Sequence, residues 1–177
     1  MGWQSEILDF WFSLEPEQWW KGDPELDAEI GELFGALWEE QRQKVAADFL
    51  TGSREALAAV ILFDQVPRNM HRGHADQFST DHLALAVAKG AVDRDYDQAL
   101  GVDERVFLYM PFQHSEDMDD QRRSLTLFTA LGSDYHLRYA RLHHDIVDRF
   151  GRFPHRNEML GRKPTEAERE AGPVFPW

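Results

Sequence analysis

The chain has 177 residues, a formal net charge of −13 and a pI near 4.9, and one domain with a substantial core accounts for this length. The acidity argues against nucleic acid or an anionic membrane as the main partner, because both are bound through a broad basic face. Cysteine is absent, which excludes disulfides, thiolate chemistry and cysteine-ligated metal sites. We therefore expect a single domain over residues 1–177.

The chain also lacks the sequence signals of membrane insertion. Its first residues do not carry the basic flank and apolar run of a signal peptide. No apolar stretch approaches the roughly 20 residues that a membrane span requires. We therefore expect a cytoplasmic protein, and the sequence leaves its oligomeric state open.

Apolar residues recur at helical spacing along most of the chain, and no segment alternates with period two for long enough to require a sheet. The pattern predicts helices over residues 5–12, 24–50, 53–66, 78–89, 102–109, 117–131 and 133–150. Gly90 is interpreted as a stop signal, and Thr165 with Glu168 as the capping box of a brief terminal helix. Residues 172–177 are expected to form an extended tail.

These elements predict an all-α fold, a compact array of about seven or eight helices joined by short turns. Stacked helical hairpins of the tetratricopeptide type are one arrangement of such an array, although no clean sequence repeat supports it.

The segment 53–66 is apolar on nearly every side, which is typical of a buried helix. Asp64 shares the direction of its apolar residues, so this carboxylate needs a partner inside the core. Arg68, one turn later, is the expected partner. Pro67 disfavours helix at Val66 and is expected to end the helix there.

Residues 150–162, FGRFPHRNEMLGR, concentrate arginine in an acidic chain. A similar phrase, LFDQVPRNMHRG, occupies residues 62–73. Both contain an apolar residue and proline before Arg-Asn, with His155 inserted in the later copy. We hypothesise that the two turns face one another and receive an anion. The candidate ligand-binding residues are Asp64, Gln65, Arg68, Asn69, Arg72, Tyr109, Arg149, Arg152, Arg156 and Asn157.

Guanidinium presents a planar fork of donors that matches carboxylate or phosphate, and it keeps its charge when partly dried. The clustered arginines therefore need anions nearby. Internal carboxylates can supply them and create a structural latch, the candidates being Asp64, Glu116 and Glu158. Alternatively, an external anion completes the set.

His114 and Glu116 follow Pro111 on a broken turn and form a candidate proton-transfer pair, with His155 as a third candidate catalytic residue. Alternatively, the residues Ser115, Glu116 and Asp117 serve to cap the next helix. No spacing matches a metal or cofactor site, so neither is expected.

Helical spacing along residues 133–150 places the residues Tyr135, Tyr139, Leu142, Ile146 and Phe150 on one stripe. His136 and His143 lie at its edge and are expected to be partly buried, whereas His144 points away. The His144-Asp145 doublet resembles that of metal-dependent phosphohydrolases only weakly, because His144 faces the wrong side.

Four blocks, ILDFWF, LFDQVPRNMHRG, FLYMPFQHSEDMDDQ and RFGRFPHRNEMLGR, resemble in this order the bacterial family of unknown function numbered 924. The resemblance extends from Ile7 to about Glu168 and departs from the family pattern at QVP, where a more aromatic variant is expected. It implies a tetratricopeptide-like all-α domain and no known activity.

Three hypotheses follow from these observations. The first is a site for a small anionic molecule, with hydrolysis or group transfer as the reaction if the protein is an enzyme. The second is a tetratricopeptide-like module that binds an acidic peptide, using the arginines as a carboxylate clamp. The third is a purely structural latch.

Overall fold

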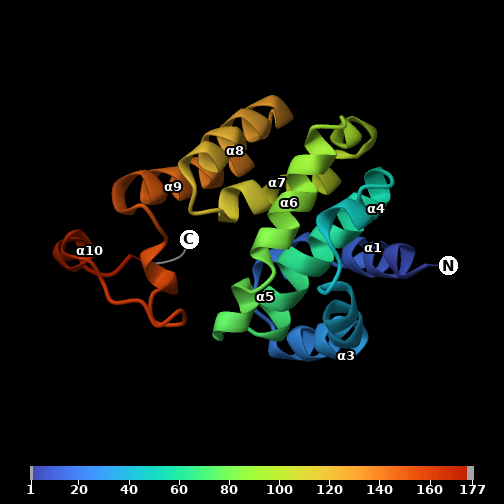
Figure 1. Ribbon diagram of the computed structural model, residues 1–177, viewed down its shortest axis with the longest axis horizontal. Coiled ribbons are helices and arrows are strands. Elements are labelled where there is room, and N and C mark those ends of the chain that lie inside the picture. Colours follow the sequence, from blue (N-terminus) through green and yellow to red (C-terminus); the bar gives the residue numbers. More distant parts are fainter. Residues whose placement is uncertain (1, 175–177) are drawn as a thin grey trace. The chain divides into compact units, whose positions relative to one another are not determined.

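The computed structural model describes residues 2–174, and all regular secondary structure in that range is helical (Figure 1). This confirms the predicted all-α fold. The chain forms two compact units that divide after Pro111, and each unit is described by itself below. The expectation of a single domain stays a prediction, and residues 175–177 of the expected extended tail lie outside the described residues.

The first unit contains most of the helices. In chain order they are α1 (Trp3–Ser13), α2 (Pro16–Trp20), α3 (Pro24–Gln41), α4 (Ser53–Val60), α5 (Val66–Met70) and α6 (Asp81–Val92), with a π-helical turn, η2 (Ile61–Gln65), between α4 and α5. Short 3₁₀ turns complete the unit: η1 (Ala46–Phe49), η3 (Ala75–Phe78) and η4 (Tyr96–Ala99). Helix α7 (Val102–His114) begins in this unit and ends beyond its boundary.

The second unit contains a helical hairpin and a shorter terminal helix. Helix α8 (Met118–Leu131) packs along α9 (Asp134–Phe150), and Gly132 between them adopts a left-handed conformation. The turn η5 (Pro154–Arg156) and helix α10 (Glu166–Ala171) follow. The predicted Thr165–Glu168 capping box is present at the start of α10.

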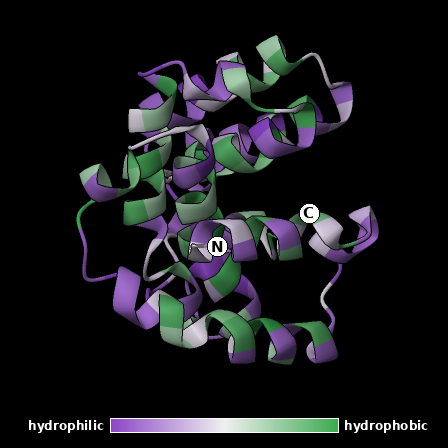
Figure 2. Ribbon diagram, turned by 90° about the vertical axis from the view of Figure 1, so that its right-hand side faces the viewer, coloured by the Kyte–Doolittle hydropathy of each residue, from purple (hydrophilic) through white to green (hydrophobic). Residues whose placement is uncertain are grey.

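The core of the first unit is built around the continuous segment α4–η2–α5. Every residue from Ala56 to Pro67 is buried, which confirms the predicted central helix. Helices α1 and α6 pack against α4, and α3 packs against α5. The surrounding helices carry both hydrophobic and hydrophilic residues (Figure 2), as expected for helices that turn one face to a core.

The prediction that Pro67 ends this helix is wrong, because the backbone changes its hydrogen-bond spacing instead. The Val66 N–H donates to Ile61 O, five residues earlier, and α5 then continues to Met70. Proline has no N–H, so Phe63 O cannot accept a bond from residue 67. The hydroxyl of Thr80 donates to Phe63 O at 2.7 Å, and Trp38 Nε1 donates to Thr80 Oγ1 at 3.1 Å.

Other boundaries also differ from the prediction. Helix α7 continues through Pro111 to His114 instead of ending at Tyr109, so His114 lies on a helix and not on a broken turn. Helix α3 ends at Gln41 rather than near Leu50, because Val45 is extended and exposed and the chain turns before it buries Phe49. Gly90 does not stop α6, which continues to Val92. A Cβ at Gly90 would lie 2.3 Å from Leu50 Cδ1, so this glycine permits close packing inside the helix.

The buried face of α9 is shifted from the predicted stripe. Its buried residues are Ala140, His143 and Val147, whereas Tyr135 and Leu142 are exposed. Small Ala140 has no side chain beyond Cβ and lets the neighbouring helix approach closely. The predicted edge of the stripe is therefore the centre of the buried face.

Within the described part of the chain, no helix has the length and apolar character needed to cross a membrane.

The chain Trp38–Thr80–Phe63 yields the first prediction. Replacing Thr80 with Val removes the hydroxyl and leaves two buried groups without this partner, which we expect to lower the free energy of unfolding by about 1–3 kcal/mol. Thr80→Ser keeps the hydroxyl and is the matched control. Urea denaturation measures both variants, and equal stability of Thr80→Val and Thr80→Ser would contradict this account of the π-turn.

Candidate functional site

The two Pro-Arg-Asn turns lie in different units, and each is described within its own unit. The first follows the π-turn, and the second connects α9 to α10. That they face one another stays a prediction.

In the first turn, Arg68 joins two carboxylates. Its Nη1 lies 3.2 Å from Asp64 Oδ1, and its Nη1 and Nη2 donate to the two oxygens of Asp81 at 2.8 and 3.0 Å. Burial acts to lower the pKa of Arg68, but Asp64 and Asp81 outweigh it and raise the pKa above its ordinary value. The expected pairing of Asp64 with Arg68 is confirmed.

The other candidates of this turn also have internal partners. Arg72 donates to both oxygens of Asp27 at 2.7 and 2.8 Å and to Asn69 Oδ1 at 3.0 Å. Gln65 Nε2 donates to Asp64 Oδ2 at 2.6 Å. The first turn is therefore tied to α3 and α6 by ion pairs within its own unit.

Tyr109 lies elsewhere in the first unit, on α7. Its hydroxyl donates to the buried carboxylate of Asp97 at 2.6 Å. Burial is the main cause that raises the pKa of Tyr109 well above its ordinary value, and the hydrogen bond to Asp97 raises it further. Tyr109 therefore remains protonated at neutral pH.

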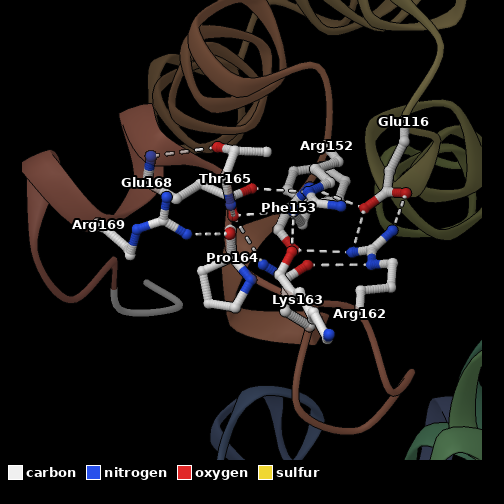
Figure 3. A network of polar contacts seen from close by, with 10 residues as sticks. Glu116, Arg152, Phe153, Arg162, Lys163, Pro164, Thr165, Glu168 and Arg169 are labelled. Atoms are coloured by element: carbon white, nitrogen blue, oxygen red, sulfur yellow. Dashed lines mark hydrogen bonds and ion pairs between the residues drawn. The ribbon is translucent and has the colours of Figure 1, made fainter.

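The second turn begins where Gly151 ends α9 in a left-handed conformation with φ 69°. Glu116, which precedes α8, enters this turn and binds Arg162 with both oxygens at 2.7 and 3.0 Å (Figure 3). Its Oε1 also accepts the backbone N–H of Phe153 at 2.7 Å. Burial acts to raise the pKa of Glu116, but the bonds from Arg162 and Phe153 lower it overall.

A second carboxylate, Glu168 of α10, binds the other side of the turn. Its two oxygens accept from Arg152 Nε at 2.7 Å and Nη2 at 2.9 Å (Figure 3). Asn157 Nδ2 donates to Glu168 Oε2 at 3.0 Å. The bond from Arg152 is the main cause that lowers the pKa of Glu168 to about 2.

Two histidines and Arg156 contact the buried ring of Phe153, and a third histidine, His114, has its ring centroid 6.0 Å from that of His143. The ring centroids of His143 and His155 each lie 5.7 Å from that of Phe153. The guanidinium carbon of Arg156 lies 4.5 Å from the same ring, and Arg156 Nη2 donates to His114 O at 3.1 Å. We call His114, His143, His155 and Arg156 the histidine cluster.

The histidine cluster disfavours additional positive charge. Burial is the main cause that lowers the pKa of His143 well below 6.5, and the nearby His114 is the second cause. Burial is the main cause that lowers the pKa of His155 to about 4, and the positive charge of Arg156 is the second cause. His143 Nδ1 is hydrogen-bonded to Tyr139 O at 2.8 Å, and because a carbonyl oxygen accepts, Nδ1 carries the proton and Nε2 is the basic nitrogen of a neutral ring.

The sequence allowed two interpretations of the residues before α8: a proton-transfer pair or a helix cap. Asp117 Oδ1 accepts from the N–H groups of Asp119 and Asp120 at 2.8 and 3.2 Å, which confirms a cap. Ser115 Oγ accepts from the N–H of Asp117 at 3.2 Å. Glu116 does not cap, because its carboxylate is bound to Arg162 and Phe153. The catalytic roles of His114, Glu116 and His155 stay predictions.

Sequence reasoning found Glu116 as a partner for the arginines but missed Glu168. The predicted capping box places Glu168 in the first turn of α10, but no spacing predicts its contact with Arg152, 16 residues earlier. Glu158, the other carboxylate considered, is exposed. Arg149 is also exposed, with its guanidinium carbon 4.8 Å from the ring of Phe150. His144, whose side chain is 22% exposed, pairs with Asp145 at 3.2 Å.

Among residues 2–174, no group of three or more His, Asp or Glu side chains is arranged to hold a metal ion.

Comparisons with known proteins identify a family for this chain but no activity. Residues 7–171 match the model of a bacterial protein family of unknown function, DUF924. A solved structure of a protein of unknown function from Agrobacterium tumefaciens, ATU0120, is 39% identical, covers 95% of both chains and superposes with a TM-score of 0.89. No characterised protein matches the chain significantly.

The pairing of Glu116 with Arg162 yields the second prediction. Glu116→Gln keeps the shape of the side chain but removes its charge, so we expect the free energy of unfolding to fall by about 1–2 kcal/mol, allowing for screening of this partly exposed pair. Glu158→Gln removes the same charge at an exposed position and is the matched control. If both variants unfold at the same urea concentration, Glu116 does not hold the turn.

Proposed function

Because this chain belongs to the bacterial DUF924 family, whose function is unknown, we propose its function from its own geometry: it binds a small anionic molecule, a carboxylate or a phosphate, at the histidine cluster. The observation that carries the proposal is the grouping of two imidazoles and a guanidinium around one buried ring, with the imidazole of His114 next to that of His143. Such a grouping gives an anion one permanent positive charge and, where an imidazole becomes protonated, a further N–H donor.

The electrostatics of the cluster support an anion rather than a cation. Arg156 and the neighbouring imidazoles each act to lower the pKa of His143. The same groups would stabilise a negative charge placed among them. Bound anion would in turn favour the protonated imidazoles, because binding and protonation are thermodynamically linked.

The ion pairs of the turn support the same proposal by giving the cluster a fixed frame. Glu116 holds both the N–H of Phe153 and the guanidinium of Arg162. His143, His155 and Arg156 contact the ring of Phe153. The structural latch and the anion site are therefore complementary: the latch positions the site.

The cluster is also suited to proton transfer. A neutral imidazole can accept a proton from a bound molecule or from water, and the adjacent guanidinium can stabilise negative charge that develops on oxygen. This chemistry fits hydrolysis or group transfer on the bound anion, with His155 and His143 as the proton-transferring groups.

The alternative, a tetratricopeptide-like module that clamps an acidic peptide, depends on arginines that accept an external carboxylate. In the second unit, Arg152 and Arg162 are bound bidentately by Glu168 and Glu116. An external peptide could use these arginines only by displacing one of the two carboxylates, so we propose the small anion at the histidine cluster as the function.

Thermal unfolding tests the proposal with phosphate, sulfate, acetate and succinate, each compared with chloride at equal ionic strength. At ten times its dissociation constant, a bound anion stabilises the fold by about 1.4 kcal/mol, which raises the Tm by about 3–5 °C. We expect this shift in the wild type, larger at pH 5 than at pH 8, and its loss in Arg156→Ala.

Arg149→Ala is the matched control, because it removes an exposed arginine of the same segment. It should keep the full shift, and circular dichroism at 20 °C should show that both variants are folded. The proposal is contradicted if no anion stabilises the wild type, or if Arg156→Ala and Arg149→Ala respond alike.

A further inference from the structure

Helix α10 is attached to its unit by a single buried side chain. From residue 163 to residue 170, every residue except Glu168 is at least partly exposed, while Glu168 is 5% exposed. In the ribbon, α10 lies beyond the end of α9 rather than alongside the α8–α9 hairpin (Figure 1). Apolar packing therefore contributes little to the attachment of this helix.

The carboxylate of Glu168 lies in a set of donors of the kind that proteins use for an acidic ligand. Arg152 supplies a two-pronged fork, and Asn157 supplies an amide N–H to Oε2. The backbone N–H of Thr165 adds a fourth bond at 2.7 Å. We call Arg152 and Asn157 the carboxylate cradle; Figure 3 labels Arg152 and the bound Glu168.

We infer that the carboxylate cradle is a docking site for a glutamate side chain of a peptide with the pattern Thr-x-x-Glu, and that α10 fills this site in cis. The inference goes beyond the anion site at the histidine cluster, because it concerns different side chains and a different class of ligand. Helix α10 then acts as an internal competitor that a suitable peptide must displace.

The pattern of donors explains the preference for a peptide over a free carboxylate. Arg152 and Asn157 supply three of the four bonds to Glu168, and the remaining bond comes from Thr165, on the same segment as the carboxylate. A free carboxylate lacks that fourth donor. A peptide with threonine three residues before glutamate brings it, because the two residues form a capping box at the start of a helix.

The exposure of the pair explains why α10 can be displaced. Arg152 retains 21% of its side-chain surface, so water and salt reach the ion pair and weaken it. Helix α10 has only 6 residues, and a helix this short is marginal without tertiary contacts. Loss of the Glu168 contact is therefore expected to release the whole segment.

The test uses the full-length Glu168→Ala variant and a synthetic peptide, KPTEAEREAG, which reproduces residues 163–172. We expect the variant to bind this peptide at least tenfold more tightly than the wild type does, because the wild type carries its own Glu168. A peptide with Glu168→Gln should bind at least tenfold more weakly than the unmodified peptide. The double variant Glu168→Ala, Arg152→Ala should not bind it.

Hydrogen exchange provides a second measurement that does not depend on the peptide. In full-length Glu168→Gln, the amides of residues 166–171 should exchange at least tenfold faster than in the wild type, while those of α8 and α9 remain unchanged. Glu170→Gln, which alters an exposed glutamate of the same helix, is the matched control and should leave all rates unchanged.

Three results would overturn the inference: equal peptide affinity of Glu168→Ala and wild type, equal affinity for the two peptides, or unchanged exchange in Glu168→Gln. Acetate at the same carboxylate concentration should bind Glu168→Ala more weakly than the peptide, and equal binding would contradict the role assigned to Thr165. The anion shift that depends on Arg156 is measured separately, so the two proposals can fail independently.

Discussion

A guanidinium that leaves bulk water must keep its charge and therefore needs an acceptor, and this constraint organises both turns. Arg68 and Arg72 find carboxylates on α6 and α3, within the first unit. Arg152 and Arg162 find Glu168 and Glu116, within the second. Because removing one partner leaves the other charge uncompensated, these pairs fix the conformation of the turns more than they add net stability.

The carboxylate partners distinguish arginines that act as a structural latch from Arg156 of the histidine cluster, a distinction that the sequence alone did not give. Arginines bound bidentately by carboxylates hold the backbone of the second turn, including the N–H of Phe153. Arg156, His143 and His155 contact the Phe153 ring, where burial and like charge lower the pKa values of these two histidines. We propose that this arrangement of imidazoles and one cation, positioned by the ion pairs of the turn, binds an anion.

The sequence predicted the features that depend on periodicity and local chemistry: the all-α fold, the buried central helix, the Asp64–Arg68 pair and the capping box of α10. It failed where a distant contact decides the outcome. Pro67 continues the helix because Thr80 supplies a donor for the carbonyl of Phe63, and Gly90 lies inside α6 because Leu50 occupies the space of a Cβ. Glu168 was missed for the same reason, since its contact with Arg152 depends on the path of the intervening turn.

The most direct test of the central claim is a pH titration of the histidine ring resonances by NMR, in sulfate and in chloride at equal ionic strength. We predict that His143 and His155 titrate well below 6.5 in chloride, and that sulfate raises both pKa values in the wild type but not in Arg156→Ala. The resonances of His74, whose side chain is 70% exposed, serve as the comparison. Titration of His143 and His155 near 6.5, with no response to sulfate, would contradict an anion site at the histidine cluster.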